Sequence, residues 1–167
     1  MFDKVELRDI IFENVDIILS LTPEENQRRF VEPVAKTIAL AYAGINESCP
    51  GFLSAIYYNG EPVGSILVGR SRISKTEPES LHKYEYAYRI IGFFIDKHYQ
   101  RRGIGRTALK LALEKLNVYP DAKHLPVYIE CHHENTAALT LYESCGFQNI
   151  NVILDDCDCV LVRFPDI

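Results

Sequence analysis

The sequence lacks any apolar run long enough to cross a bilayer, and residues 1–6 do not have the layout of a signal peptide. Its net charge of −5 gives no indication of the basic surface that nucleic-acid binding requires. Internal repeats and low-complexity tracts are also missing. We therefore expect a cytoplasmic protein that binds neither membrane nor nucleic acid.

A disulfide framework is lacking as well. The five cysteines are odd in number and have no framework spacing, which argues for reduced thiols. Cys157-x-Cys159 has the form of half a metal site, but no second pair accompanies it. A strand with alternating faces explains this spacing better, and we expect no bound metal.

What the sequence does have is the composition of an ordinary globular protein, with 25% charged and 47% hydrophobic residues. A length of 167 residues suits a single domain over residues 1–167 with a full core. Outside two central segments, the patterns predict strands at residues 5–9, 53–58, 63–69, 147–154 and 159–164, and helices at 13–21 and 33–43. Asn14 is a candidate N-cap, and Asn59-Gly60 predicts a hairpin turn.

The first central segment runs from Arg89 to Arg106 and predicts a buried strand, a turn and a helix. The apolar run at residues 90–95 is typical of a strand covered on both faces. The alternating Tyr84, Tyr86 and Tyr88 before it suit an exposed start of that strand. A turn of the form Q-x-x-G-x-G follows, and apolar residues then recur at helical spacing from Ile104 onward.

This turn has the chemistry of an anion site. The first amides of a helix lack intrahelical partners, and the helix dipole makes that end partly positive. Gly103 and Gly105 let a ligand approach the backbone, and arginines add fixed charge. The turn matches neither a Walker loop nor a dinucleotide fingerprint. On its own it also fits an ordinary strand-to-helix turn with solvated arginines.

A second strand and helix lie between Val127 and Phe147. Residues 127–131 read as a strand, Asn135 is a good N-cap, and Gly146 is a plausible helix-terminating residue. The two strings Y-Q-R-R-G-I-G-R and N-T-A-A-L-T-L-Y-E-S-C-G-F together resemble the acyl-CoA core of the GNAT N-acetyltransferase superfamily. The resemblance covers a little over a third of the chain. It implies an α/β fold in which helices flank a mixed, strongly twisted sheet.

The resemblance also implies a co-substrate, acetyl-CoA, and no metal. Backbone groups of Phe93, Phe94 and Ile95 would pair with the pantetheine arm, which Asn135 would contact from the second helix. The pyrophosphate would lie on the turn that contains Gln100, Arg101, Arg102, Gly103, Ile104, Gly105 and Arg106.

Two residues are candidate catalysts. Tyr142 matches the tyrosine that many superfamily members place near the thioester sulfur, and a phenol of pKa ~10 can protonate a thiolate of pKa ~8.5 at a cost of about 2 kcal/mol. Without the resemblance, Tyr142 would read as a half-buried core aromatic. Glu130 is the candidate base, with a solvent-facing or ion-paired carboxylate as the alternative. His132 and His133 could relay a proton, although polar surface is the preferred interpretation.

One departure from the superfamily pattern leaves the base open. Many members place a basic carboxylate on the central strand, but residues 89–95 contain none. Glu85 is the nearest carboxylate, and it lies well before the motif.

The acceptor is predicted from the first half of the chain. Residues 21–42 are similar to the substrate-side helices of diamine and polyamine acetyltransferases, and Glu24, Glu25 and Glu32 could receive a polycation. The cluster of Asp155, Asp156 and Asp158 is a further candidate. A solvated charged face is the alternative for each of these carboxylates.

We therefore expect direct acetyl transfer from acetyl-CoA to a primary amine, best a small polyamine or diamine. A protein N-terminus, an aminoglycoside or an amino acid are alternative acceptors. A non-catalytic acyl-CoA sensor is an alternative of another class. Because members of the superfamily are often dimers, a homodimer is among the expected assemblies.

Overall fold

The computed structural model describes residues 4–154 and 158–165 of the chain. Its main elements are β1 (Val5–Asp9), α1 (Phe12–Ser20), α2 (Val34–Asn46), β2 (Gly51–Tyr58), β3 (Glu61–Arg72), β4 (Tyr86–Ile95), α3 (Ile104–Lys115), β5 (Val127–His132), α4 (Thr136–Glu143), β6 (Gln148–Leu154) and β7 (Asp158–Arg163). Short 3₁₀ helices lie in the connections at Glu25–Phe30, Glu79–Leu81, Leu116–Val118 and Ala122–His124. In the described part of the chain, every helix is too short or too polar to cross a membrane.

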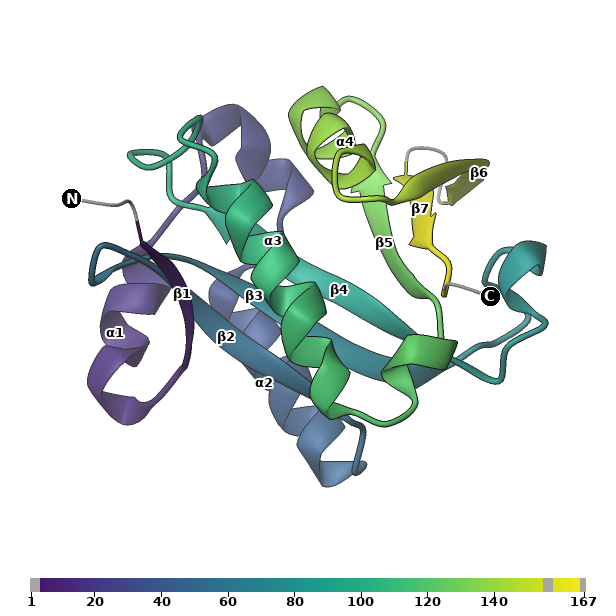
Figure 1. Ribbon diagram of the computed structural model, residues 1–167. Helices are drawn as coiled ribbons and strands as arrows, with labels where there is room; N and C mark the ends of the chain where they lie inside the picture. The colour runs from purple at the N-terminus through teal and green to yellow at the C-terminus, as the bar shows by residue number, and fades with distance from the viewer. Residues whose placement is uncertain (1–3, 155–157, 166–167) are drawn as a thin grey trace.

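The strands form one mixed sheet in the order β1-β2-β3-β4-β5-β7-β6. All neighbours are antiparallel except β4 and β5. Figure 1 shows α3 on one face of this sheet and α1 and α2 on the other. The expected fold, a mixed sheet flanked by helices, is confirmed.

The two faces of the sheet are buried against different helices. Ile104, Ala108, Leu109 and Ala112 recur at helical spacing and bury one side of α3 in the largest apolar cluster. On the opposite face, a smaller cluster includes Ile18 of α1. β4 lies between these two layers, with Ile90 and Ile95 buried in the larger cluster and Phe94 in the smaller one. Because Ile91 and Phe93 are only partly buried, the predicted burial on both faces holds for part of the apolar run.

Local signals set most element boundaries. Asn59 and Gly60 both have positive φ, 51° and 91°, and join β2 to β3 as the predicted hairpin turn. The prediction for Asn14 was wrong: Ile11 is the N-cap of α1, and Asn14 accepts a hydrogen bond from the Ile11 amide from inside the helix. Helix α2 ends at Asn46, three residues beyond the expected end.

The expected exposure of the start of β4 was wrong for Tyr88. Tyr88 is fully buried, and its hydroxyl donates a 2.9 Å hydrogen bond to Asp121, which also pairs with Arg70. Burial, together with this hydrogen bond, raises the pKa of Tyr88 above its usual range. The loop after α3 therefore covers a position that strand alternation alone assigns to solvent.

Candidate active site

The parallel strands β4 and β5 are joined at one end only. Their ladder consists of two pairs, Tyr88 with Val127 and Arg89 with Tyr128. Beyond these pairs the strands diverge toward α4, as Figure 1 shows. A cavity of about 470 Å³ lies between the diverging ends, and we call it the β4–β5 cavity. Because a strand edge without a neighbour has unpaired N–H and C=O groups, this edge of β4 suits an extended ligand.

A β-bulge at Gly92 shapes the open end of β4. Between Ser65 and Leu67, β3 advances two residues while β4 advances three. Gly92 has a φ of 58°, and a Cβ there would lie 2.4 Å from Oγ1 of the buried Thr37. Both observations require glycine. The residues that follow the bulge, 93–95, line the β4–β5 cavity.

The loop between β4 and α3 has a backbone suited to anions. Arg101 and Gly103 are left-handed, with φ of 60° and 75°, and α3 begins directly afterwards at Ile104. The first turn of α3 lines the cavity, so its unpaired amides lie at the place expected for a pyrophosphate. Gly105 is tightly packed there, since a Cβ would lie 3.1 Å from Leu141 of α4.

The three arginines of this loop differ in orientation. Arg101 and Arg106 line the cavity, and the Arg101 guanidinium lies 3.7 Å from the carboxylate of Glu24. Arg102 instead donates a 3.0 Å hydrogen bond to the backbone oxygen of His98. Of the cofactor-binding residues expected from the sequence, all line the cavity except Arg102.

Gln100 and Asp96 link the end of β4 to the segment before α2. Nε2 of Gln100 donates to the Ile95 oxygen at 2.9 Å and to Oε1 of Gln27 at 2.8 Å, while Asp96 accepts a 3.0 Å bond from the Thr22 amide. These contacts hold the 3₁₀ helix Glu25–Phe30 beside the cavity. The residues of this segment that line the cavity are Gln27, Phe30 and Val31. They belong to residues 21–42, the stretch that resembles substrate-side helices, although the glutamates of that stretch were the binding candidates predicted from the sequence.

Helix α4 forms the opposite wall. Its N-cap is Asn135, as predicted, and Oδ1 of Asn135 accepts a hydrogen bond from the Ala138 amide at 3.3 Å. At the other end, the Gly146 amide donates to Glu143 and the Phe147 amide to Tyr142, and Gly146 has a φ of 88°. This Schellman arrangement confirms the predicted role of Gly146.

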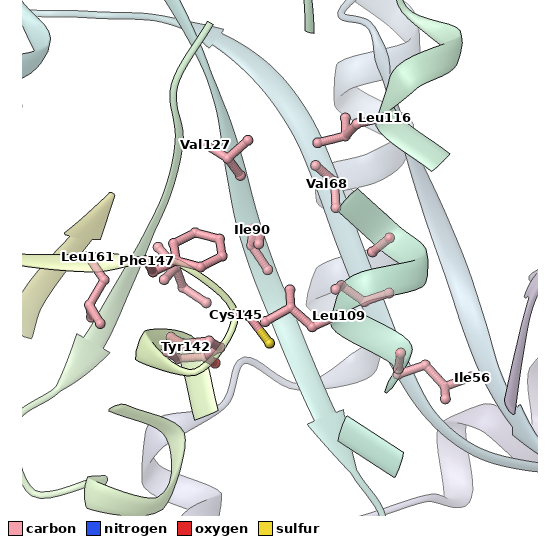
Figure 2. Close-up of a cluster of buried hydrophobic side chains, with 14 of the residues drawn as sticks. Ile56, Val68, Ile90, Leu109, Leu116, Val127, Tyr142, Cys145, Phe147 and Leu161 are labelled. Carbon is pink, nitrogen blue, oxygen red and sulfur yellow. The ribbon is translucent and has the colours of Figure 1, made fainter. Parts of the chain in front are cut away.

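Tyr142 lies between the cavity and the core. It is only 6% exposed, and its ring is 6.3 Å from Phe93 and 6.1 Å from Phe147. Figure 2 shows Tyr142 and Phe147 in the apolar cluster that also contains Ile90 and Leu109. Burial raises the pKa of Tyr142 well above its usual range, so its hydroxyl stays protonated. Both interpretations of Tyr142 therefore hold in part, since it is a core aromatic and it also lines the cavity.

Cys131 is the cysteine that lines the cavity. It is 6% exposed, and burial raises the pKa of its thiol to about 12. Because the thiolate is the nucleophilic form, this thiol is a poor acyl acceptor near neutral pH.

Glu130 lines the same cavity from β5 and pairs with Arg89 of β4. Nη2 of Arg89 lies 2.5 Å from Oε2 of Glu130, and both side chains are partly buried. Glu130 is thus ion-paired, as the alternative interpretation holds. It also lines the cavity, as a catalytic base must. Its catalytic role stays a prediction.

The loop between β5 and α4 meets the segment before α2 at the rim of the cavity. The ring of His132 lies 4.8 Å from that of Phe30, and its Nδ1 accepts a 3.2 Å hydrogen bond from the Glu134 amide. Glu134 also pairs with Arg29 at 2.5 Å. His133 stacks on His132 at 4.7 Å. Both histidines lie at the rim of the β4–β5 cavity and outside its lining, and a role in proton relay stays a prediction.

The expected acceptor-binding glutamates lie outside the lining of the β4–β5 cavity. Glu24 faces Arg101, Glu25 lies 3.1 Å from Arg28, and Glu32 lies 2.8 Å from Lys36. Two of the three pairs are therefore local contacts on an exposed surface, which contribute little. The acceptor-binding role of these glutamates stays a prediction.

Part of the predicted acidic and metal-like clusters lies outside the described residues, namely Asp155, Asp156 and Cys157. Cys159 lies in β7 opposite Cys131 of β5. Within residues 4–154 and 158–165, no group of His, Cys, Asp and Glu side chains is arranged to hold a metal ion.

A second cavity, of about 680 Å³, lies against α2 on the other face of the sheet, and we call it the α2-side cavity. Apolar residues from α2 and the sheet form much of its wall, among them Ile38, Leu53, Leu67 and Ile91. Arg89, Tyr128 and Glu77 also line it. Sequence analysis did not predict this cavity, because it depends on how α2 crosses the sheet.

Comparisons with known proteins agree with this geometry. Residues 16–147 match the model of a family described as Acetyltransferase (GNAT) family. The N-alpha-acetyltransferase RimI of Mycobacterium tuberculosis is 38% identical over 99 residues, which cover 58% of this chain and 54% of that protein. The chain thus aligns with about half the length of this relative.

Two further proteins match over most of their length. A probable spermine N(1)-acetyltransferase of Bacillus subtilis subsp. natto is 26% identical over 145 residues, or 86% of this chain and 88% of that protein. The crystal structure of the aminoglycoside acetyltransferase AAC(6')-Ib in complex with coenzyme A superposes with a TM-score of 0.70, covering 96% of this chain and 95% of that one. At 16% identity, this structure shows a shared fold.

Proposed function

The chain belongs to the GNAT family of acetyltransferases, and on that premise we propose that it moves the acetyl group of acetyl-CoA directly onto a small polyamine or diamine. One observation carries the proposal: the β4–β5 cavity joins a strand edge, an anion-binding helix start and Tyr142 in one continuous lining. The likeness to a spermine acetyltransferase over 86% of the chain supports the acceptor.

Acetyl-CoA would lie with its pantetheine arm along the open edge of β4 and its pyrophosphate on the first turn of α3. Bound there, it supplies an activated acyl group. A primary alkyl ammonium of pKa ~10.4 must first lose a proton, which costs about 4–5 kcal/mol at pH 7. Glu130 would accept this proton, and Tyr142 would donate one to the leaving thiolate. The raised pKa of Tyr142 makes full proton transfer more costly than for a free phenol, but it keeps the donor protonated.

The test is release of CoA, detected with a thiol-reactive dye, from acetyl-CoA and a panel of amines. We expect saturable release with putrescine, spermidine and spermine. A control without amine measures hydrolysis and the reaction of the dye with the protein's own cysteines. Tight acetyl-CoA binding without release from any amine would support the non-catalytic alternative and refute the proposed activity.

A peptide N-terminus is the second candidate acceptor, because the chain is 38% identical to an N-alpha-acetyltransferase over 99 residues. An α-amino group has a pKa of about 8, so its deprotonation at pH 7 costs only about 1–1.5 kcal/mol. Peptides therefore belong in the same panel. A kcat/KM for peptides tenfold above that for spermidine would select this acceptor instead.

Acetyl transfer is expected to proceed without an acetyl-enzyme. The thiol in the cavity, Cys131, has its pKa raised to about 12 by burial and is a weak nucleophile. We expect mass spectrometry of protein quenched during turnover to find no acetyl-cysteine, and initial rates to fit a ternary-complex mechanism. Acetyl on Cys131 at a stoichiometry that follows turnover would contradict direct transfer.

The arginines of the loop between β4 and α3 should contribute unequally to CoA binding. We expect Arg106→Ala to weaken CoA binding by about tenfold at low salt and less at high salt, because exposed charges are screened. Arg102→Ala is the matched control, since its guanidinium faces His98, and it should change affinity by less than about threefold. Calorimetry at two salt concentrations measures both. Equal losses for the two variants would contradict the placement of the pyrophosphate.

A further inference from the structure

The Arg89–Glu130 ion pair lies where the two cavities approach each other. Glu130 lines the β4–β5 cavity, whereas Arg89 lines the α2-side cavity, and their charged atoms are 2.5 Å apart. Arg89 belongs to the last pair of the short ladder between β4 and β5, and Glu130 lies two residues beyond that pair, where the strands diverge. This ion pair therefore lies between the two cavities.

We propose that Arg89 is a positioning residue for Glu130, and that a cationic alkyl amine reaches Glu130 through the α2-side cavity by displacing Arg89. This inference rests on the proposed function for the identity of the acyl acceptor. It adds the route of the acceptor and the residue that competes with it.

The lining of the α2-side cavity fits such a ligand. Its apolar wall suits a chain of methylene groups. Its charged lining residues are the three carboxylates Asp9, Glu47 and Glu77 and the two guanidiniums Arg70 and Arg89, a balance of −1. Arg70 is neutralised by Asp121, which leaves Arg89 as the cation that an ammonium group meets near Glu130.

Arg89 has a second carboxylate to move toward. Burial works against the ionisation of Glu77, but hydrogen bonds from Ser74 and the charge of Arg89 together keep its pKa below the usual value. Glu77 also lines the α2-side cavity. A displaced guanidinium thus remains near an anion, which lowers the cost of the exchange.

The exchange prepares Glu130 for proton transfer. While Arg89 is paired with Glu130, the guanidinium occupies Oε2, the oxygen that would accept the proton. Once an alkyl ammonium takes that place, its N–H proton passes to Oε2 of Glu130. The freed nitrogen lone pair then forms the new C–N bond as the C–S bond of the thioester breaks, and the thiolate takes a proton from Tyr142. The acylated nitrogen gives up its second proton to solvent, and Tyr142 regains one from solvent. Glu130 returns its proton to solvent.

Other charged and titratable groups lie near Glu130. Arg89 pairs with it, and Tyr128 and His132, two residues before and after it in β5, share its strand face. Asp158 of β7 is paired in register with His132. The test therefore changes the charge of Arg89 and leaves these neighbours in place.

The first test measures binding of spermidine to the CoA-loaded protein by calorimetry at pH 8. We expect Arg89→Met to lower the Kd by about threefold to tenfold, because the competing cation is gone, and Arg89→Lys to stay near wild type. Arg72→Met is the matched control, since it removes a guanidinium from the same sheet outside both cavities, and it should change the Kd by less than about twofold. Glu130→Gln in the Arg89→Met background should remove the gain. An unchanged or weaker affinity of Arg89→Met for spermidine overturns the displacement.

The second test separates this inference from the proposed function. In Arg89→Met, the acid limb of kcat/KM should move to higher pH, since the Glu130 carboxyl loses the neighbouring guanidinium that favours an ionised carboxylate. A tenfold loss of kcat with the limb and KM unmoved would show a purely structural role and overturn the inference. If the wild type acetylates no amine, the proposed function fails, while the binding experiment still decides whether an alkyl ammonium competes with Arg89.

Discussion

Replacing Tyr142 with phenylalanine is expected to lower kcat by about 10²- to 10³-fold, the range typical of a lost general acid. The ring keeps its place between Phe93 and Phe147, so the packing of α4 and the affinity for CoA should change little. Steady-state kinetics with the best acceptor measure the effect. The departing thiolate then has to take its proton from water, or leave unprotonated.

The pH dependence adds a second readout. Burial raises the pKa of Tyr142 above its usual range, so the hydroxyl stays protonated, and a basic limb in the wild-type profile must come from another group. The variant should therefore lower the whole kcat profile without moving its limbs. Tyr119→Phe is the control, because it removes a hydroxyl that donates a 2.6 Å hydrogen bond to the Gly51 oxygen, outside the β4–β5 cavity. Equal kcat for Tyr142→Phe and wild type would remove Tyr142 from the mechanism.

Gly92→Ala is expected to destabilise the protein by about 2–5 kcal/mol. The left-handed backbone accounts for about 1–2 kcal/mol, and overpacking against Thr37 for about 1–3 kcal/mol. The new Cβ would lie 2.4 Å from Oγ1 and 2.8 Å from Cγ2 of Thr37. Thermal melting should show a loss of about 5–15 °C. Activity should fall as well, because the bulge positions the strand edge that would hold acetyl-CoA.

Two variants separate the causes. Gly60→Ala also places alanine at a positive φ, 91°, but a Cβ there has no atom within 4 Å, so it should cost only the backbone share. Adding Thr37→Ala to Gly92→Ala should recover part of the loss, although Thr37→Ala alone empties a buried site. A melting temperature of Gly92→Ala equal to that of Gly60→Ala would show that the contact with Thr37 does not matter.

The segments that line the β4–β5 cavity, where acetyl-CoA is expected to bind, were predictable because their signals are local. The glycine turn marks the start of the helix that directly follows it, and Asn135 marks the start of the next helix in the same way. The bulge was harder to foresee, since Gly92 is needed partly because α2 places Thr37 against it. Tyr88 was misjudged for the same reason: Asp121, which covers it, lies 33 positions away.

The acceptor side was the least predictable part of the site. Glu24, Glu25 and Glu32 were candidates because they lie in a segment similar to substrate-side helices. In the structure each lies close to a basic residue. Glu130 finds its partner 41 residues upstream, on a neighbouring strand. Contacts of this kind depend on the register and crossing of distant elements, which composition and periodicity do not encode.

The two-pair ladder between β4 and β5 has a mechanical consequence. The backbone of the sheet is nearly divided at this seam, and side-chain packing with α3 and α4 holds the two parts together. A ligand that contacts both parts of the sheet at this junction would stabilise the folded state. At a concentration 100 times its Kd, it would add about 2.7 kcal/mol to the free energy of unfolding. Acetyl-CoA that contacts both parts of the sheet should therefore raise the melting temperature and slow proteolysis.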